Sequence, residues 1–149
     1  MKTLLISLLL LLLAIPYDAA NAMTFDRLFA VKVEEYTNNL RTALHITSLG
    51  KDACLTAAAL AKAKDVATRG YLSHAPAGES WQTFVNACSW QEVSENIAFH
   101  YEYPFEAYVG LKESPPHRQA MLAKHYNRIG VGSYEKYSGR WITVMYVAQ

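Results

Sequence analysis

The sequence predicts an α+β protein, specifically a three-layer α-β-α sandwich with a small antiparallel sheet between helices. Two observations lead to this fold class. In the N-terminal half, apolar residues recur at three- and four-residue steps, the spacing of one buried helix face. In the C-terminal part, segments 128–137 and 140–147 are strand-like and apolar on both faces. A sheet built from them should therefore be covered by helices on both sides.

A first helix is expected to start at Thr24, which can cap it, with Asp26 in the first turn. Its apolar face consists of Phe25, Leu28, Phe29, Val33, Tyr36, Leu40 and Leu44. The polar and glycine-containing segment 47–50 then ends it.

Asp52 is predicted to cap a second, Ala-rich helix that ends near Arg69, with Gly70 as its C-terminal stop. An Ala-rich helix face lets another element approach closely. Residues 71–78 are interpreted as a loop, and Ser80 is expected to cap a short helix that contains Trp81.

The segment from Cys88 to Phe99 is compatible with either a strand or a turn. Pro104 is expected to open a helix that continues to about Lys112, and Ser114-Pro115 is a favourable start for one more. The two final strands should be joined by a hairpin at Ser138-Gly139. Along the last strand, the residues predicted to face one way are Ile142, Val144 and Tyr146, and those predicted to face the other are Trp141, Met145 and Val147.

Length and charge exclude several classes of protein. The chain has 149 residues and a formal net charge of +1, which favours one domain and gives no basic stripe for nucleic acid. It also gives no polybasic patch for a membrane surface.

The N-terminus has the pattern of a secretory leader over residues 1–22. Lys2 precedes an apolar run from Leu4 to Ile15, and Ala20-Asn21-Ala22 is a small-residue cleavage site. The run is about 12 residues, shorter than the roughly 20 that span a bilayer, so an uncleaved anchor is the less favoured alternative. We therefore expect residues 23–149 to form a single mature domain that is periplasmic or extracellular, with no transmembrane helix after cleavage.

Cys54 and Cys88 are the two cysteines of the chain, and no Cys-x-x-Cys pair or metal-finger spacing occurs. In an oxidising compartment, two cysteines indicate one disulfide. The alternative is a pair of buried free thiols.

Three ionisable residues lie near the ends of predicted elements: His74 in the loop after the second helix, Glu95 in the segment 94–98, and His117 in the first turn after Ser114-Pro115. Two His and one Glu form a ligand set for zinc or another divalent metal with an open position. Protonated histidines also bind carboxylates or phosphates. Arg118 follows His117 and could hold an anionic group. A purely structural network, in which Glu95 bonds one histidine and joins two loops, explains the same residues.

Four motifs around these residues occur in a fixed order: Gly70-Tyr71-Leu72-Ser73-His74, Glu95-Asn96-Ile97-Ala98, the segment 114–122 (SPPHRQAML), and Ile129-Gly130-Val131-Gly132. Together they resemble the CAP superfamily, named for cysteine-rich secretory proteins, antigen 5 and pathogenesis-related one proteins. The sequence looks most like its short bacterial branch. The resemblance begins near Arg41 and covers nearly all of the expected mature domain.

The resemblance implies an α-β-α sandwich and a cleft where two His and two acidic residues converge. By motif, His74, Glu95 and His117 match three of the four positions. Family members with the complete set have a Trp followed three residues later by Glu, and here the matching positions are Leu111 and Ser114. Ser114 suits a helix cap, and the adjacent Glu113 is the only acidic substitute, so we expect a three-residue site.

Three functions follow as hypotheses. The first is a non-catalytic binding module for a lipid, a glycan or an envelope protein, using His74, Glu95, His117 and Arg118. The second is a metal-dependent hydrolase in which a zinc on the His and Glu residues activates water and Glu113 is the general base. The third is a structural or partner-binding domain with a silent cleft.

Overall fold

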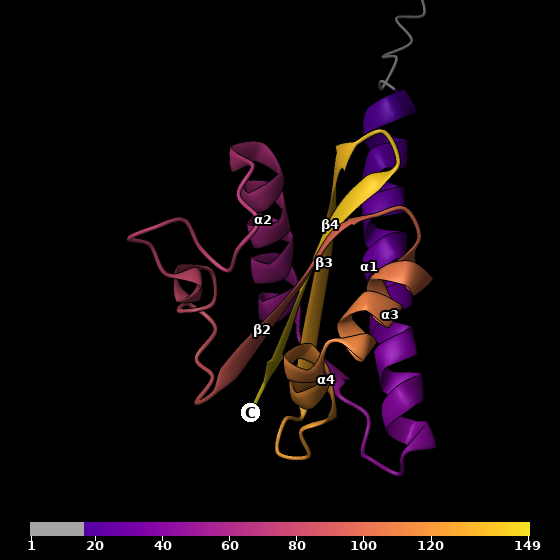
Figure 1. Ribbon diagram of the computed structural model, residues 1–149, viewed down its shortest axis with the longest axis vertical. Helices are drawn as coiled ribbons and strands as arrows, with labels where there is room; N and C mark the ends of the chain where they lie inside the picture. Colours follow the sequence, from indigo (N-terminus) through magenta and orange to yellow (C-terminus); the bar gives the residue numbers. More distant parts are fainter. Residues whose placement is uncertain (1–16) are drawn as a thin grey trace, which may run out of the picture.

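The computed structural model describes the backbone of residues 17–149 and the side chains of residues 25–149. The elements in chain order are α1 (Tyr17–Ala43), β1 (Gly50–Lys51), α2 (Ala53–Arg69), the 3-10 helix η1 (Trp81–Phe84), β2 (Val93–Tyr101), α3 (Pro104–Glu113), α4 (Pro115–Leu122), β3 (Arg128–Tyr137) and β4 (Arg140–Ala148). Figure 1 shows them as a sheet between two layers of helices.

The four strands are arranged in the order β1-β3-β4-β2. The pair β3–β4 is antiparallel, as predicted for the final hairpin, and the pair β2–β4 is antiparallel too. Strand β1 is parallel to β3 and pairs through only two residues. The sheet is therefore mixed at one edge, and β2 forms the other edge.

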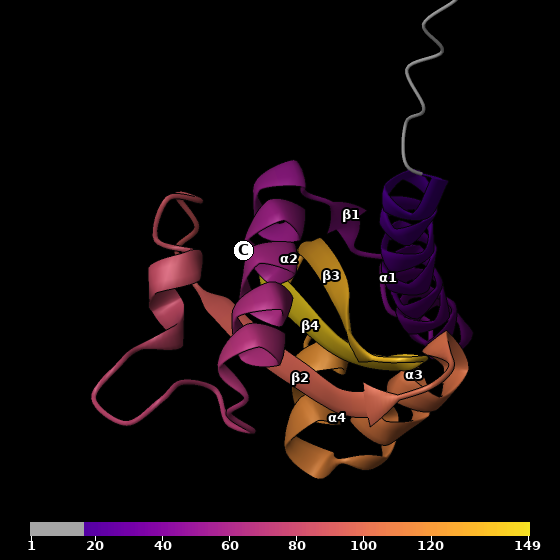
Figure 2. The ribbon, with the colours of Figure 1, turned by 90° about the horizontal axis from the view of Figure 1, so that it is seen from above.

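Each face of the sheet is covered by its own layer of helices (Figure 2). One core cluster joins α1, α3 and α4 to the face that carries Trp141, Met145 and Val147. The other joins α2 and η1 to the face that carries Ile142, Val144 and Tyr146. The predicted alternation along the last strand and the predicted three-layer architecture are both confirmed.

Most helix boundaries also agree with the sequence. The Asp52 side chain accepts a hydrogen bond from the Leu55 amide at 2.7 Å and caps α2, and Gly70 ends it in the left-handed conformation with φ of 76°. The Ser80 side chain accepts from the Gln82 amide at the start of η1. Strand β3 has the predicted range, β4 extends one residue beyond it to Ala148, and the two are joined at Ser138-Gly139.

Three local predictions need correction or are now decided. Helix α1 begins at Tyr17 and not at Thr24, because the segment 17–23 contains Ala and Met, which are good helix formers, and no residue that stops propagation. The segment 47–50 ends α1 but also supplies β1. The undecided segment 88–99 contains strand β2, which begins at Val93.

Two glycines of β3 let α2 lie directly on the sheet. A Cβ atom at Gly132 would lie 2.1 Å from the Leu60 backbone nitrogen, and one at Gly130 would lie 2.3 Å from the backbone carbonyl carbon of Leu55. On the α2 side, Ala59 and Ala63 are fully buried at this contact. Small residues on both elements thus set the distance between helix and sheet.

The apolar run of the expected leader, Leu4 to Ile15, lies outside the described residues, and the expected cleavage site at Ala22 falls inside α1. No helix among residues 17–149 is both long and apolar enough to cross a membrane.

Candidate functional site

The Glu95 carboxylate lies at the centre of the site and joins two of its neighbours. Its Oε1 atom lies 2.7 Å from His74 Nδ1, and its Oε2 atom accepts a hydrogen bond of 2.7 Å from the Tyr146 hydroxyl. The Glu95 side chain is 1% exposed and that of His74 is 54% exposed. A buried carboxylate therefore holds a histidine that is open to solvent on its other side.

Local structure explains how these residues meet. Glu95 on β2 and Tyr146 on β4 are directly opposed in the antiparallel register, so their side chains share a face of the sheet. His74 lies in the loop that follows Gly70, the C-cap of α2. The predicted convergence of His74 with Glu95 is present in the structure, and the role of Tyr146 was not predicted.

Lys62 is a further member of the site that the sequence analysis missed. Its side chain is fully buried on α2, and its Nζ donates to the Tyr71 hydroxyl at 2.8 Å and to the backbone carbonyl of His74. The Tyr71 hydroxyl in turn donates to Asp65 at 2.6 Å. This cation therefore ties the His74 loop to α2 beside the Glu95 carboxylate.

His117 reaches the site from the opposite layer. Its backbone carbonyl accepts a hydrogen bond of 3.1 Å from the Asn96 side chain. Because Glu95 and Asn96 are neighbours on β2, their side chains point to opposite faces of the sheet. The two histidines thus approach the site from the two sides of the edge strand β2, one from the loop after α2 and one from α4.

The pKa values of the two histidines are shifted in opposite directions. The hydrogen bond that His74 donates to Glu95 raises the pKa of His74 above its ordinary value of 6.5, although burial and the charge of Lys62 oppose this. Burial, followed by the positive charge of His74, lowers the pKa of His117 below 6.5. At pH values between the two pKa values, His74 is protonated and His117 is neutral.

Arg41 positions the layer that contains His117. It is fully buried, and its guanidinium donates to the backbone carbonyls of Thr47, Met121, Ala123 and Tyr126 at 2.8 to 3.3 Å. Burial lowers the pKa of Arg41. One side chain therefore fixes the end of α1 to the end of α4 and to the segment before β3.

Arg118 is not joined to this site. Among the described residues, its guanidinium makes no hydrogen bond or ion pair with His74, Glu95 or His117. Its charge acts on Tyr108 of α3, where it lowers the pKa of that phenol against the larger effect of burial. A ligand contact of Arg118 stays a prediction.

The positions that match the family's second acidic residue hold no carboxylate directed at His74. Leu111 is buried in the core, and Glu113, the last residue of α3, is exposed. Ser114 is the N-cap residue of α4, with its carbonyl accepting from the Arg118 amide at 2.8 Å, but its side chain makes no capping hydrogen bond. Among the described residues, Glu95 is therefore the acidic residue that contacts His74.

Within the described part of the chain, no group of three His, Cys, Asp or Glu side chains is arranged to hold a metal ion. The Nδ1 atom of His74 is hydrogen-bonded to Glu95. A zinc ion at this place would need the same carboxylate as a ligand. The residues as they are arranged do not fit a metal bound by His74, Glu95 and His117 together, and we derive no chemistry through one.

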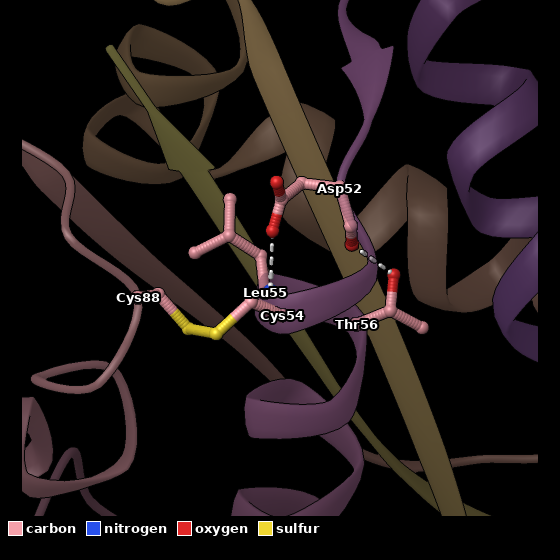
Figure 3. Close-up of a disulfide and its surroundings, with 5 residues drawn as sticks. All are labelled: Asp52, Cys54, Leu55, Thr56 and Cys88. Atoms are coloured by element: carbon pink, nitrogen blue, oxygen red, sulfur yellow. Dashed lines mark hydrogen bonds between the residues drawn. A yellow bond between two sulfur atoms is a disulfide. The ribbon is translucent and has the colours of Figure 1, made fainter.

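A disulfide between Cys54 and Cys88 closes the loop that contains His74 (Figure 3). The Cα atoms of the two residues are 5.7 Å apart. Cys54 lies in the first turn of α2, next to the Asp52 cap, and Cys88 lies between η1 and β2. The bond confirms the predicted pairing and restrains both ends of the segment from which His74 extends.

Three hollows of the described residues lie away from the histidine site. They are lined by segments of α1, β1, α2 and β3, or by η1 and the residues after it, and His74, Glu95 and His117 line none of these three. The side chain of His74 is instead 54% exposed at the surface.

A comparison with protein families decides the affiliation of the chain. The model of the CAP family, described as the cysteine-rich secretory protein family, matches residues 34–147. The chain belongs to the CAP family. The match includes His74, Glu95, His117 and all four motifs, so the resemblance seen in the sequence is confirmed.

Solved structures show the same fold at low sequence identity. An extracellular protein containing an SCP domain from Bacillus anthracis has a TM-score of 0.78 at 21% identity, over 87% of this chain and 43% of that one. An outer surface protein from Borrelia burgdorferi has a TM-score of 0.71 at 17% identity, over 89% and 95% of the two chains. A cysteine-rich secretory protein from Staphylococcus aureus has a TM-score of 0.67 at 11% identity, over 83% and 39%.

The CAP chain described here thus spans less than half the length of the Bacillus anthracis protein. A search of curated proteins finds no matching sequence. These structural similarities establish the fold alone.

Proposed function

We propose that this CAP domain is a secreted, non-catalytic binding module that recognises a glycan of the cell envelope or extracellular space at the His74–Glu95–His117 site. The expected leader at residues 1–22 supports export to the periplasm or the outside of the cell. The Cys54–Cys88 disulfide supports an oxidising compartment.

The observation that carries the proposal is the solvent-facing imidazole of His74. Glu95 accepts from Nδ1, and within the described residues no protein group bonds to Nε2. The raised pKa of His74 keeps both ring nitrogens protonated over a wider pH range. Nε2 is thus an oriented N–H donor, backed by a buried carboxylate and free to bond an oxygen atom of a ligand.

The surroundings favour a sugar over a lipid. Two partly buried aromatic side chains adjoin the site, and the three hollows described above lie away from it. Tyr71 is held by Lys62 and Asp65, and Trp81 stacks on Tyr146 with ring centroids 5.9 Å apart. Aromatic rings with a polar edge suit ligands that have both apolar faces and hydroxyl groups.

Titration with soluble peptidoglycan fragments and with uncharged oligosaccharides, followed by NMR, tests this proposal. We expect a saturable shift of the His74 and His117 resonances in the wild-type protein and loss of binding in His74→Ala and His117→Ala. His125→Ala, which changes an exposed histidine paired with Glu92, is the matched control. Binding that persists in both site variants, or no binding of any glycan, would contradict the proposal.

The hydrolase alternative makes a different prediction. It requires peptide or ester turnover by the zinc-loaded protein above a His117→Ala control. The silent-cleft alternative requires that His74→Ala lower stability while no ligand of any class is bound.

A further inference from the structure

One of the three hollows lies between η1 and the start of β2 and is lined by uncharged side chains. Its volume is about 230 Å³. Sites for drug-sized ligands measure roughly 300–1,000 Å³, so this hollow suits a unit the size of one sugar ring. Figures 1 and 2 show that the segment between α2 and β2 projects beyond α2. The aromatic and polar side chains that line the hollow are Trp81, Gln82, Asn86, Ser89, Trp90 and Gln91.

Two indole rings form the aromatic part of the hollow. Trp81 is partly buried and stacks on Tyr146 with ring centroids 5.9 Å apart. Trp90 is also partly buried, and the Arg128 guanidinium lies 6.0 Å from its ring centroid. Among the described residues, neither indole nitrogen has a protein acceptor, and neither is a buried atom without a partner. Each ring is therefore held by a protein contact and keeps an N–H donor for a ligand.

The polar part of the hollow consists of groups that both donate and accept hydrogen bonds. The side chains of Asn86, Ser89 and Gln91 are exposed and bond to no other side chain of the described residues. Their backbone is nonetheless anchored, because the Asn86 amide donates to the Gln82 carbonyl at 2.9 Å and the Gln91 amide to the Gln149 carbonyl at 3.0 Å. The amide and hydroxyl groups are thus available to a ligand from fixed positions.

This combination of groups discriminates between possible occupants. No charged side chain lines the hollow, so an ionised ligand finds no partner there. An acyl chain would remove water from the amide groups and offer no hydrogen bond in return. A proline-rich peptide could stack on the indoles, but its backbone offers acceptors without donors and leaves the amide oxygens unpaired. A sugar ring has an apolar face for the indoles and hydroxyl groups that both donate and accept.

Trp81 lies between this hollow and the histidine site. It lines the hollow and stacks on Tyr146, whose hydroxyl donates to Glu95 at 2.7 Å. Val93 also lines the hollow and precedes Glu95 by two residues on β2. The two side chains therefore share a face of the strand and are about 7 Å apart along it. One oligosaccharide can extend over both places.

We propose that this hollow binds an uncharged sugar ring and is a second subsite for the glycan recognised at the His74–Glu95–His117 site. The indoles of Trp81 and Trp90 pack against the ring, and the amides beside them bond its hydroxyl groups. The link between the two subsites rests on the proposed function, whereas sugar binding in the hollow does not.

The indole N–H signals in NMR spectra test this proposal. The chain has three tryptophans. Trp90 is the decisive reporter, because it lines the hollow, and Trp141, which is buried in the other core cluster, is an internal control. The probes are chitotriose, cellotriose and decaproline. We expect at least one of the two trisaccharides to shift the Trp81 and Trp90 signals in a saturable way, with that of Trp141 unchanged, and decaproline to shift none of them.

Variants measure the contribution of the hollow to affinity. Trp90→Ala removes one aromatic wall and should weaken trisaccharide binding about tenfold. Asn86→Ala, at an exposed residue outside the core, should weaken it about threefold. The matched controls are Tyr137→Ala, at an exposed aromatic residue, and Asn39→Ala, at an exposed amide of α1, and both should keep the wild-type affinity.

This inference and the proposed function fail in different ways. If a trisaccharide shifts the His74 signals while the Trp90 signal and the affinities of Trp90→Ala and Asn86→Ala stay unchanged, the glycan site stands and the second subsite is wrong. If Trp90 responds and the two histidines do not, the hollow binds sugar and the histidine site is not part of the recognition. The inference is also wrong if neither trisaccharide moves the Trp90 signal, or if decaproline occupies the hollow and displaces the sugar.

Discussion

Glu95 affects the protonation of both histidines at the site. It acts directly on His74 through the 2.7 Å hydrogen bond to Nδ1, and indirectly on His117 through the charge that it stabilises on His74. Lys62 opposes this effect, because its own charge lowers the pKa of His74. The three residues therefore form a coupled set whose members can be changed one at a time.

Glu95→Gln should lower the pKa of His74 and raise that of His117. The neutral amide removes the charge-assisted hydrogen bond, and with less positive charge on His74 the repulsion that lowers the pKa of His117 is reduced. Titration of the imidazole C–H resonances by NMR measures both values. Glu92→Gln, at an exposed carboxylate outside the site, is the control. An unchanged His74 pKa in Glu95→Gln would show that the hydrogen bond is absent in solution.

Lys62→Met should shift the pKa of His74 in the opposite direction, upward, because it removes the opposing cation. It should also destabilise the fold by about 1–3 kcal/mol, since the partly buried carbonyl of His74 loses its donor. Urea unfolding and the same NMR titration measure the two effects. Lys64→Met, at an exposed residue of the same helix, should change neither.

The two histidines predict a stability maximum near pH 6.5. His74 has a raised pKa, so its contribution is complete below about 6.5 and is lost as the pH rises through its folded pKa. His117 has a lowered pKa, so its contribution is present above about 6.5 and is lost as the pH falls through its folded pKa. Unfolding free energies measured across this range should fall on both sides in the wild type. In Glu95→Gln, the decrease on the alkaline side should be smaller.

At the scale of elements, the contact between α2 and β3 depends on the absence of side chains. The Ala-rich face of α2 was visible in the sequence, and so was the Gly-x-Gly pattern of β3. Only the structure shows that these two small-residue surfaces pack on each other, because neither sequence pattern indicates which element it contacts.

Gly132→Ala should destabilise the protein by about 3 kcal/mol or more, since the added methyl group would overlap backbone atoms of α2 that cannot rotate away. Gly78→Ala is the matched control, because no atom lies within 4 Å of its Cβ and only its positive φ of 82° is unfavourable. It should cost about 1 kcal/mol. Equal losses in the two variants, measured by chemical denaturation, would argue against the close contact of helix and strand.

Two buried charged residues, Lys62 and Arg41, lie at positions where helix periodicity places the apolar face. Lys62 lies at three- and four-residue spacing from Ala58, Ala59 and Val66, on the face that the structure buries. Arg41 follows Val33 and Thr37 at steps of four in the same way. A charged residue on an apolar helix face indicates a buried polar contact, but its partners are distant in sequence and cannot be read from the pattern.

At the scale of the whole molecule, the site depends on two layers meeting at one edge strand. The layers, the hairpin and the contact of His74 with Glu95 were predictable from local patterns and motif order. The Glu95–Tyr146 pair was not, because it depends on the β2–β4 register, and the sequence left segment 88–99 undecided. The short strand β1 was also missed, since two residues carry too little pattern to be recognised.

The disulfide joins these parts across the α2 layer. Replacing both cysteines, in Cys54→Ser/Cys88→Ser, should lower the unfolding free energy by about 4 kcal/mol, the value that the chain-entropy model gives for a loop of this size. Because the loop contains His74, we also expect faster amide exchange at residues 71–80 and a smaller shift of the His74 pKa. Unfolding curves under oxidising and reducing conditions, with the double variant as reference, measure the loss. A wild type that is insensitive to reductant would contradict this role.

The most direct test of the central claim is the NMR signal of the two imidazole rings in the presence of a glycan. We predict that a binding peptidoglycan fragment or oligosaccharide shifts the Nε2 resonance of His74 and the ring resonances of His117 in a saturable way, and that Glu95→Gln weakens this response. If a glycan binds while both rings keep their free-state signals, or if no glycan binds, the site at the edge of β2 is not the recognition site that we propose.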